Sequence, residues 1–276
     1  MDLYAKVAYE NSRHLTLSYS TSFGMSSRFF GKQIQPHIYA VYGLVRIADE
    51  IVDTYKGPDA EALLDDLEKT TYAALKSGYS TNPIVHAFGL TAQKYGIAKQ
   101  LIKPFFESMR MDLHPQDYSP KYYEKYIYGS AEVVGLMCLR VFCDGNDKLY
   151  ESLREGASAL GAAYQKVNFL RDMAADYKEL GRLYFPGSTF EMFGEKEKQA
   201  IVRDIKNDFK KALPALHKLP ESSRKATLLS YVYYSELLNK LEKTPVDSIK
   251  TSRVRIPNSK KFLLMATTLS GARAAK

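Results

Sequence analysis

Cysteine, tryptophan and linker-like sequence are scarce in this chain of 276 residues, and each scarcity excludes a class of protein. The two cysteines, Cys138 and Cys143, are too few for a disulfide scaffold or a zinc site, and their apolar neighbours predict that both are small buried residues of a helix. Tryptophan is absent, and the 16 glycines and 11 prolines are dispersed, so no Gly/Ser-rich hinge divides the chain. We therefore expect a single domain over residues 1–276, with a core large enough to need no crosslinks.

Long apolar runs are missing as well. No run approaches the ~20 residues that span a bilayer, and the longest, 133–143, is interrupted by Arg140. The first residues lack the apolar segment of a secretory signal. These features predict a cytoplasmic protein.

The charge of the chain favours an anionic partner. Lys and Arg outnumber Asp and Glu by 39 to 31, which gives a net charge of +8. Nucleic acid, anionic lipid and a phosphorylated small molecule all fit this balance, although a charged surface also serves solubility. The basic residues are interspersed, and no helix-turn-helix, zinc or RNA-binding motif is present, so we expect no nucleic acid partner.

Apolar residues recur at helical spacing along nearly the whole chain, and the sequence has no alternating runs of the kind that form strands. Single Pro and Gly residues mark the ends of these segments. We predict an all-α fold with helices at 36–53, 60–77, from 83, from 104, and at 120–142, 148–180, 197–213 and 222–243, with a short C-terminal helix after a looser segment at 244–259.

Two acidic residues share one face of the first predicted helix. Asp49 and Asp53 are four residues apart, which places their Cβ atoms about 5–6 Å from each other. Like charges at this spacing destabilise a helix unless something neutralises them, and Arg46 lies one turn earlier. A pair of this kind is often only a solvated helix face, so it does not identify a metal site by itself.

A second oxygen-rich stripe follows later in the chain. Gln165, Asn168, Asp172 and Asp176 are spaced by three, four and four residues on an otherwise apolar helix, with Arg171 beside them. Burying such a stripe is costly unless cations neutralise it. Mg²⁺ prefers oxygen ligands and often shares them with substrate phosphates. The two stripes together predict a cleft in which Mg²⁺ links acidic side chains to a diphosphate.

Six segments resemble the squalene/phytoene synthase family, in the same order and over about residues 15–265. The two acidic stripes resemble its two aspartate-rich motifs. The segments are 19–23, 42–53, 126–135, 165–176, 181–186 and 253–257.

The resemblance implies an isoprenoid-synthase-type helical bundle around a central hydrophobic cavity, and a prenyltransferase that couples two prenyl diphosphates head to head. The implied catalytic residues are Asp49, Asp53, Asp172, Asp176 and Tyr126. Mg²⁺, with Mn²⁺ as an alternative, would be held by Asp49, Asp53, Asn168, Asp172 and Asp176. The implied diphosphate-binding residues are Tyr19, Ser20, Thr21, Ser22, Tyr42, Arg46, Gln165, Arg171, Tyr234 and Arg253.

The donor depends on the length of the cavity, whose expected lining includes Phe23, Ser27, Val134 and Gly135. Ser27 is small where a bulky ring would shorten a tunnel, so we expect geranylgeranyl diphosphate as the donor. The product would then be phytoene, made through a cyclopropyl (prephytoene) diphosphate in the first step of carotenoid synthesis, as in bacterial phytoene synthases. Two alternatives stay open: a squalene or dehydrosqualene synthase that uses farnesyl diphosphate, and a catalytically inactive relative that acts as a binding or assembly protein.

The same resemblance bears on cofactors and partners. No Gly-rich dinucleotide motif follows a strand, so we do not expect NADPH. Because the product is a long hydrocarbon, we expect peripheral contact with a membrane, through the basic residues Arg253, Arg255, Lys260 and Lys261. The sequence gives no indication of an oligomeric state.

Overall fold

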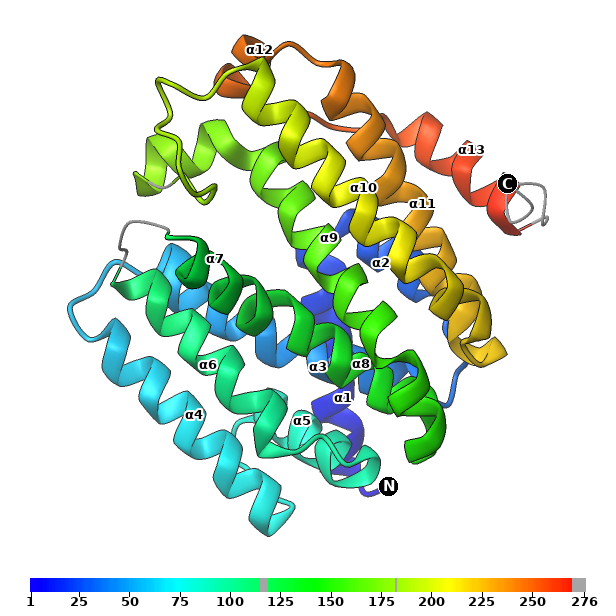
Figure 1. Cartoon of the computed structure of the whole chain (residues 1–276). Coiled ribbons are helices and arrows are strands. Elements are labelled where there is room, and N and C mark those ends of the chain that lie inside the picture. Colours follow the sequence, from blue (N-terminus) through cyan, green and yellow to red (C-terminus); the bar gives the residue numbers. More distant parts are fainter. Residues whose placement is uncertain (115–118, 182, 270–276) are drawn as a thin grey trace.

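The computed structural model describes residues 1–114, 119–181 and 183–269, and every regular element in these ranges is a helix (Figure 1). The elements before the first gap are α1 (Leu3–Tyr19), α2 (Thr21–Ser27), α3 (Gln35–Asp49), the π-helix η1 (Glu50–Thr54), α4 (Ala60–Ser77), α5 (Pro83–Tyr95) and α6 (Lys99–Leu113). After it come α7 (Pro120–Ile127), the π-helix η2 (Tyr128–Glu132), α8 (Val133–Cys143), α9 (Asp147–Leu180), α10 (Glu195–Lys218), α11 (Glu221–Lys243), α12 (Val246–Thr251) and α13 (Asn258–Leu269). The all-α prediction is confirmed.

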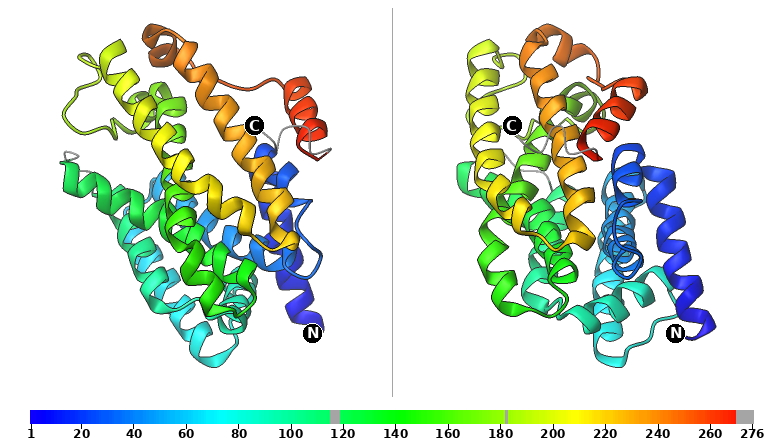
Figure 2. Two further views of the ribbon diagram at one scale, coloured as in Figure 1. Left: turned by 45° about the vertical axis from the view of Figure 1, so that its right-hand side comes forward. Right: turned by 90° about the vertical axis from the view of Figure 1, so that its right-hand side faces the viewer.

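The helix α9 is the central element of the bundle. It has 34 residues, and α8 and α10 pack along it. Figure 1 shows α9 between the helices of the N-terminal half and the pair formed by α10 and α11. Figure 2 shows α13 beside α2, on the face that also carries α1. In this arrangement α1 packs against α3, which carries the first acidic stripe, and α13 packs against α11.

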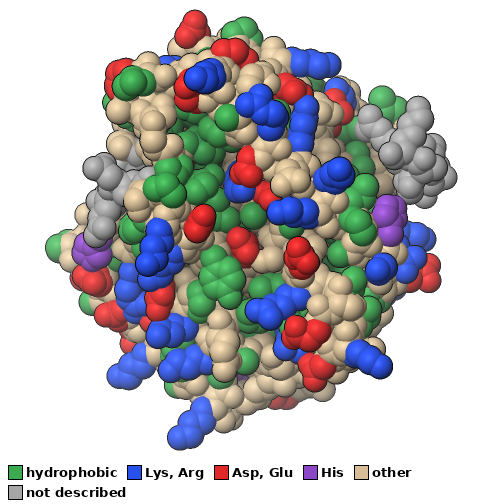
Figure 3. Space-filling view, viewed as in Figure 1, with side chains coloured by type: hydrophobic (Ala, Val, Ile, Leu, Met, Phe, Trp, Pro, Cys, Tyr) green, Lys and Arg blue, Asp and Glu red, His purple; other side chains and the backbone are tan. Residues whose placement is uncertain are grey.

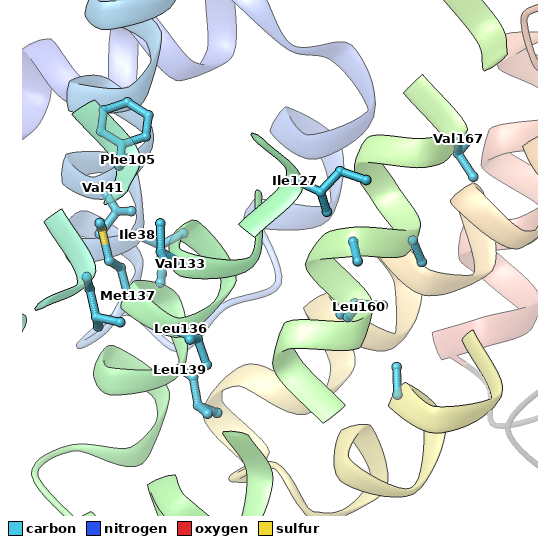
Figure 4. Packing of buried hydrophobic residues seen from close by; sticks show 14 of the residues in the cluster. Ile38, Val41, Phe105, Ile127, Val133, Leu136, Met137, Leu139, Leu160 and Val167 are labelled. Carbon is cyan, nitrogen blue, oxygen red and sulfur yellow. The ribbon is translucent and has the colours of Figure 1, made fainter. Parts of the chain in front are cut away.

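A buried apolar cluster extends through most of the bundle, and Figure 4 shows the part of it that includes α3, α6 and α8. Ile38 and Val41 of α3, Phe105 of α6, and Leu136 and Met137 of α8 are all at most 1% exposed. Apolar burial of this kind stabilises a fold by about 25 cal/mol for each Å² removed from water. The core therefore holds α3, and with it the first acidic stripe, in a fixed orientation.

Two predicted helix boundaries are wrong. Pro104 was expected to begin a helix but lies inside α6, and Pro214 was expected to end one but lies inside α10. A proline in a helix removes one backbone hydrogen bond. Buried side chains on both sides of each proline, such as Ile102 and Phe105 in α6, keep these helices continuous. The looser segment 244–259 also contains the short helix α12.

The segments α7, η2 and α8 form one continuous helix over Pro120–Cys143, which is long and apolar enough to cross a membrane. In the fold, 56% of the most apolar 18-residue stretch of this helix is buried, as in a core helix. Its packing against α6 is very close at Gly129, where an added Cβ would overlap the carbonyl oxygen of Pro104. Glycine is therefore required at this contact.

Candidate active site

A cavity of about 550 Å³ lies between α2, α3, η2, α8, α9, α10 and α11. Much of its lining is apolar and includes Phe30, Val134, Cys138, Leu139, Phe142, Leu153, Leu160, Leu216 and Leu219. The central hydrophobic cavity implied by the resemblance is thus present. Cys143 is buried in the core and Cys138 lines the cavity, where burial raises the pKa of its thiol to about 12.

Polar side chains from five parts of the chain line the same cavity, and some of them contact one another. We call them the polar group: Tyr19, Arg46, Gln165, Asn168, Arg171, Tyr234 and Arg253. The Tyr234 hydroxyl donates to Oδ1 of Asn168 at 3.3 Å, and the Arg46 guanidinium lies 4.4 Å from the centre of the Tyr19 ring. Figure 3 shows acidic and basic side chains around apolar ones near the middle of the face seen in Figure 1.

The first acidic stripe lies at the junction of α3 and η1. Arg46 is 3.9 Å from Asp49 and forms a close ion pair with Glu50. Burial, followed by the charge of Asp53, raises the pKa of Asp49 to about 8, while Arg46 opposes this rise. A π-helix at this point is typical of functional sites. Arg46 by itself therefore does not compensate the charged form of Asp49.

The second acidic stripe is paired differently. Asp172 accepts hydrogen bonds from Arg171 on the same helix, with 2.6 Å between Nη2 and Oδ2. Arg253, from the segment after α12, lies 2.7 Å from Oδ1 of the same carboxylate. The charge of Asp176 also acts on Arg253. Two arginines thus neutralise Asp172.

The donor set at the two stripes fits a hard divalent cation, because it consists of carboxylate and amide oxygens. In the described parts of the chain, no three His, Cys, Asp or Glu side chains are already arranged as a metal site. A cation beside Asp49 would lower its pKa again and favour the charged carboxylate, which is the form that binds a metal. At Asp172, a cation would share the carboxylate with Arg171 or displace Arg253.

Most of the residues expected in the cavity line it, with one exception. Phe23, Val134 and Gly135 are part of the lining, and so are Ser20 and Tyr42. Tyr42 stacks on Phe23 with 5.4 Å between ring centres, and burial raises its pKa to about 12. The side chains of Thr21 and Ser22 lie outside the described part of the structure.

The prediction that Ser27 lines the cavity is wrong. Its side chain is fully buried, its hydroxyl donates to the carbonyl oxygen of Gly24 at 3.1 Å, and the same hydroxyl lies 3.4 Å from the hydroxyl of Tyr39. Ser26 lines the cavity in its place. The rotation of α2 against α3 decides which of the two serines faces inward, so the size of Ser27 gives no measure of cavity length.

Asp112 is a further residue next to the site, and it was not predicted from the sequence. It lies in the last turn of α6, is 4% exposed and accepts a hydrogen bond from the Tyr126 hydroxyl at 2.9 Å. Its charge also acts on Asp49. The sequence pattern could have indicated that Asp112 is buried, because it follows Phe105 and Met109 at helical spacing on the buried face of α6. A carboxylate at such a position needs a partner.

Comparison with known proteins identifies the family. A family model described as squalene/phytoene synthase matches residues 17–260. The chain belongs to the squalene/phytoene synthase family. The matched range of this prenyltransferase family includes both acidic stripes and every residue of the polar group.

The similar proteins include plant enzymes and enzymes of known structure. Phytoene synthase 3 of Zea mays is 25% identical and phytoene synthase of Cucumis melo 27% identical, each over 94% of this chain, which spans only 65% of the length of either relative. A dehydrosqualene synthase crystallised with a ligand has a TM-score of 0.84 at 20% identity, with 98% of both chains covered. A squalene synthase from Alicyclobacillus acidocaldarius has a TM-score of 0.77 at 22% identity, over 91% of this chain and 98% of its own. These structures establish the fold.

Proposed function

We propose that this protein condenses two molecules of geranylgeranyl diphosphate head to head into phytoene, in a Mg²⁺-dependent reaction. The observation that carries the proposal is the cavity, because it joins an apolar interior to a group of arginines and oxygen-bearing side chains. A prenyl diphosphate has the same two parts, a hydrocarbon chain and an anionic head. The names of the maize and melon relatives favour the C20 donor.

The polar group supplies the contacts for the diphosphates. Arg46, Arg171 and Arg253 line one cavity and present charged N–H donors, which bind phosphate oxygens strongly. Mg²⁺ held by the two acidic stripes would neutralise the departing diphosphate. Gln165 and Tyr234 add neutral donors beside the arginines.

The apolar interior serves the cationic part of the reaction. Loss of diphosphate from the first donor leaves an allylic cation, which the double bond of the second donor attacks to give a tertiary cation. Loss of a proton from this cation closes the ring of the cyclopropyl diphosphate. A second ionisation, rearrangement and loss of a second proton give phytoene. Such cations require a cavity without water and with aromatic faces. Tyr164 and Tyr234, stacked with 4.0 Å between ring centres, supply such faces in the cavity wall.

A second candidate is the coupling of farnesyl diphosphate to dehydrosqualene or squalene. It is favoured by the rings of Phe30 and Phe142, which lie 5.4 Å apart and both line the cavity. Bulky rings in the cavity wall leave less room for a long prenyl chain.

Product analysis separates these candidates. Purified protein is incubated with Mg²⁺ and with each donor in turn, with and without NADPH, and the hydrocarbon products are identified by mass. Phytoene as the main product supports the first proposal, and dehydrosqualene or squalene supports the second. Donor binding without any product would identify an inactive relative that acts as a binding protein.

We also propose that α13 contacts a membrane surface, into which the product is released. Phe262 and Leu263 are 56% and 63% exposed and follow the two lysines of this helix, although Lys260 is paired with Glu236. Apolar and basic side chains on one exposed helix fit an anionic bilayer. Flotation with anionic liposomes tests this: Phe262→Ser with Leu263→Ser should reduce binding, whereas Met192→Ser, at a side chain that is 75% exposed elsewhere, should not. Equal binding of all variants to the liposomes would contradict the proposed membrane contact.

A further inference from the structure

Asp112 and Tyr126 form a buried pair between α6 and α7. Each residue is 4% exposed, and the Tyr126 hydroxyl donates to Oδ2 of Asp112 at 2.9 Å. A phenol has a single hydrogen to donate. Because this hydrogen is donated to Asp112, the Tyr126 oxygen can only accept hydrogen bonds from its other neighbours.

The ring of Tyr126 is held on its other sides by aromatic residues next to the second acidic stripe. It stacks on Tyr184 with 5.5 Å between ring centres and lies 5.9 Å from Phe169. Phe169 follows Asn168 on α9 and stacks on Tyr184 at 4.1 Å. The phenol is therefore fixed between α6 and the part of α9 that carries the second stripe.

Asp112 also acts on the first acidic stripe. Its charge is one of those that reach Asp49, and α6 packs against η1, which carries Asp53. One buried carboxylate thus connects Tyr126 with the stripe expected to attract the cation.

We propose that Asp112 is a positioning residue, which fixes the Tyr126 phenol as a hydrogen-bond acceptor beside the two acidic stripes. The inference rests on the proposed function, because it assumes that Tyr126 acts on the reacting groups. An acceptor oxygen beside these carboxylates would stabilise positive charge, such as the protons of water on a bound cation. The role of Asp112 is indirect and depends on Tyr126.

A double-mutant cycle tests this dependence. The variants are Asp112→Ala, Tyr126→Phe and the double variant, assayed for kcat and KM with the donor that the wild type uses. We expect Asp112→Ala to lower kcat about 10- to 100-fold with less than a threefold change in KM, and the double variant to be no slower than the slower single variant. Asp112→Asn keeps an acceptor oxygen for Tyr126 and should recover at least a third of the wild-type kcat.

Asp208→Asn is the matched control. Asp208 is also a buried carboxylate, 8% exposed, but it pairs with Lys166, which keeps Asp204 as a second partner. Its kcat should stay within threefold of the wild type. Wild-type kcat in Asp112→Ala, or losses that multiply in the double variant, would overturn the proposal. If Asp112→Ala does not fold, Asp112→Asn replaces it, and a kcat as low as that of Tyr126→Phe would count against the proposal.

A second measurement is independent of activity. Fluorotyrosine labels the 21 tyrosines, and the ¹⁹F signal of Tyr126 is the one missing from Tyr126→Phe. Asp112→Ala should shift this signal and Asp208→Asn should leave it in place. If the Tyr126 signal does not move in Asp112→Ala, the positioning role is overturned, whether or not the wild type forms a product. Absence of product in the wild type would by itself reject only the proposed function.

Discussion

Arg253 and Asp172 are 81 residues apart in the sequence and form an ion pair, with 2.7 Å between Nε and Oδ1. The pair joins the segment after α12 to the second acidic stripe on α9. Arg171 bonds the same carboxylate, so Asp172 is neutralised by protein side chains. Arg253 also lines the cavity, so it lies between the stripe and the space in which we propose that the diphosphate binds.

This position predicts the effect of Arg253→Ala. The variant should raise the KM for the donor about 10- to 100-fold, because one charged hydrogen bond to phosphate is lost. Steady-state kinetics at saturating Mg²⁺ measure the change. Arg255→Ala removes the same charge two residues further on, where the side chain is exposed, and should leave KM within twofold. An equal rise of KM in both variants would show that the loss of any positive charge has this effect, and would contradict a specific role of Arg253.

Asp49→Asn should abolish activity and stabilise the metal-free protein. The carboxylate is held near Asp53 and Asp112, and burial with these charges raises its pKa to about 8. Removing the charge relieves the repulsion, so the free energy of unfolding in EDTA at pH 8 should rise by about 1 kcal/mol, or about 2–4 °C in Tm. Calorimetry measures this gain. A lower Tm in EDTA would contradict the repulsion, and retained activity would contradict the role of Asp49.

Gly129→Ala should destabilise the fold. In a helix interior this change normally favours stability by about 0.5–1 kcal/mol. Here the added Cβ would overlap the carbonyl oxygen of Pro104, so we expect a loss of about 1–3 kcal/mol. Urea unfolding measures it. Ser130→Ala is the control, because the Ser130 hydroxyl finds no hydrogen-bond partner in the described part of the chain. A stable Gly129→Ala variant would show that α6 and η2 can move apart.

His37 should make the fold sensitive to acid. It is buried among Tyr9, Thr91 and Tyr95, and burial, with the charge of Lys94 added, lowers its pKa to about 4. Between pH 6.5 and pH 4 the unfolded chain binds a proton that the folded chain does not, so stability falls as the pH falls through this range, by about 3 kcal/mol. Urea unfolding at several pH values should show a smaller loss in His37→Gln. If the free energy of unfolding falls equally with pH in the wild type and in His37→Gln, the prediction is contradicted.

How much could be predicted from the sequence depended on how local each feature is. Helices such as 60–77 follow from spacing and end signals within a few residues, and α4 begins and ends as expected. Pro104 and Pro214 misled the prediction because the buried residues around them, which are set by distant helices, outweigh the local preference.

The candidate site divides in the same way. The sequence by itself determined the all-α fold and the two acidic stripes, because residues three and four apart on a helix must share a face. Only the tertiary structure decided that Ser26 rather than Ser27 faces the cavity, that Arg253 reaches Asp172, and that Asp112 meets Tyr126. These contacts join residues on different helices, and their geometry depends on how the helices rotate and pack against one another, which no local spacing specifies.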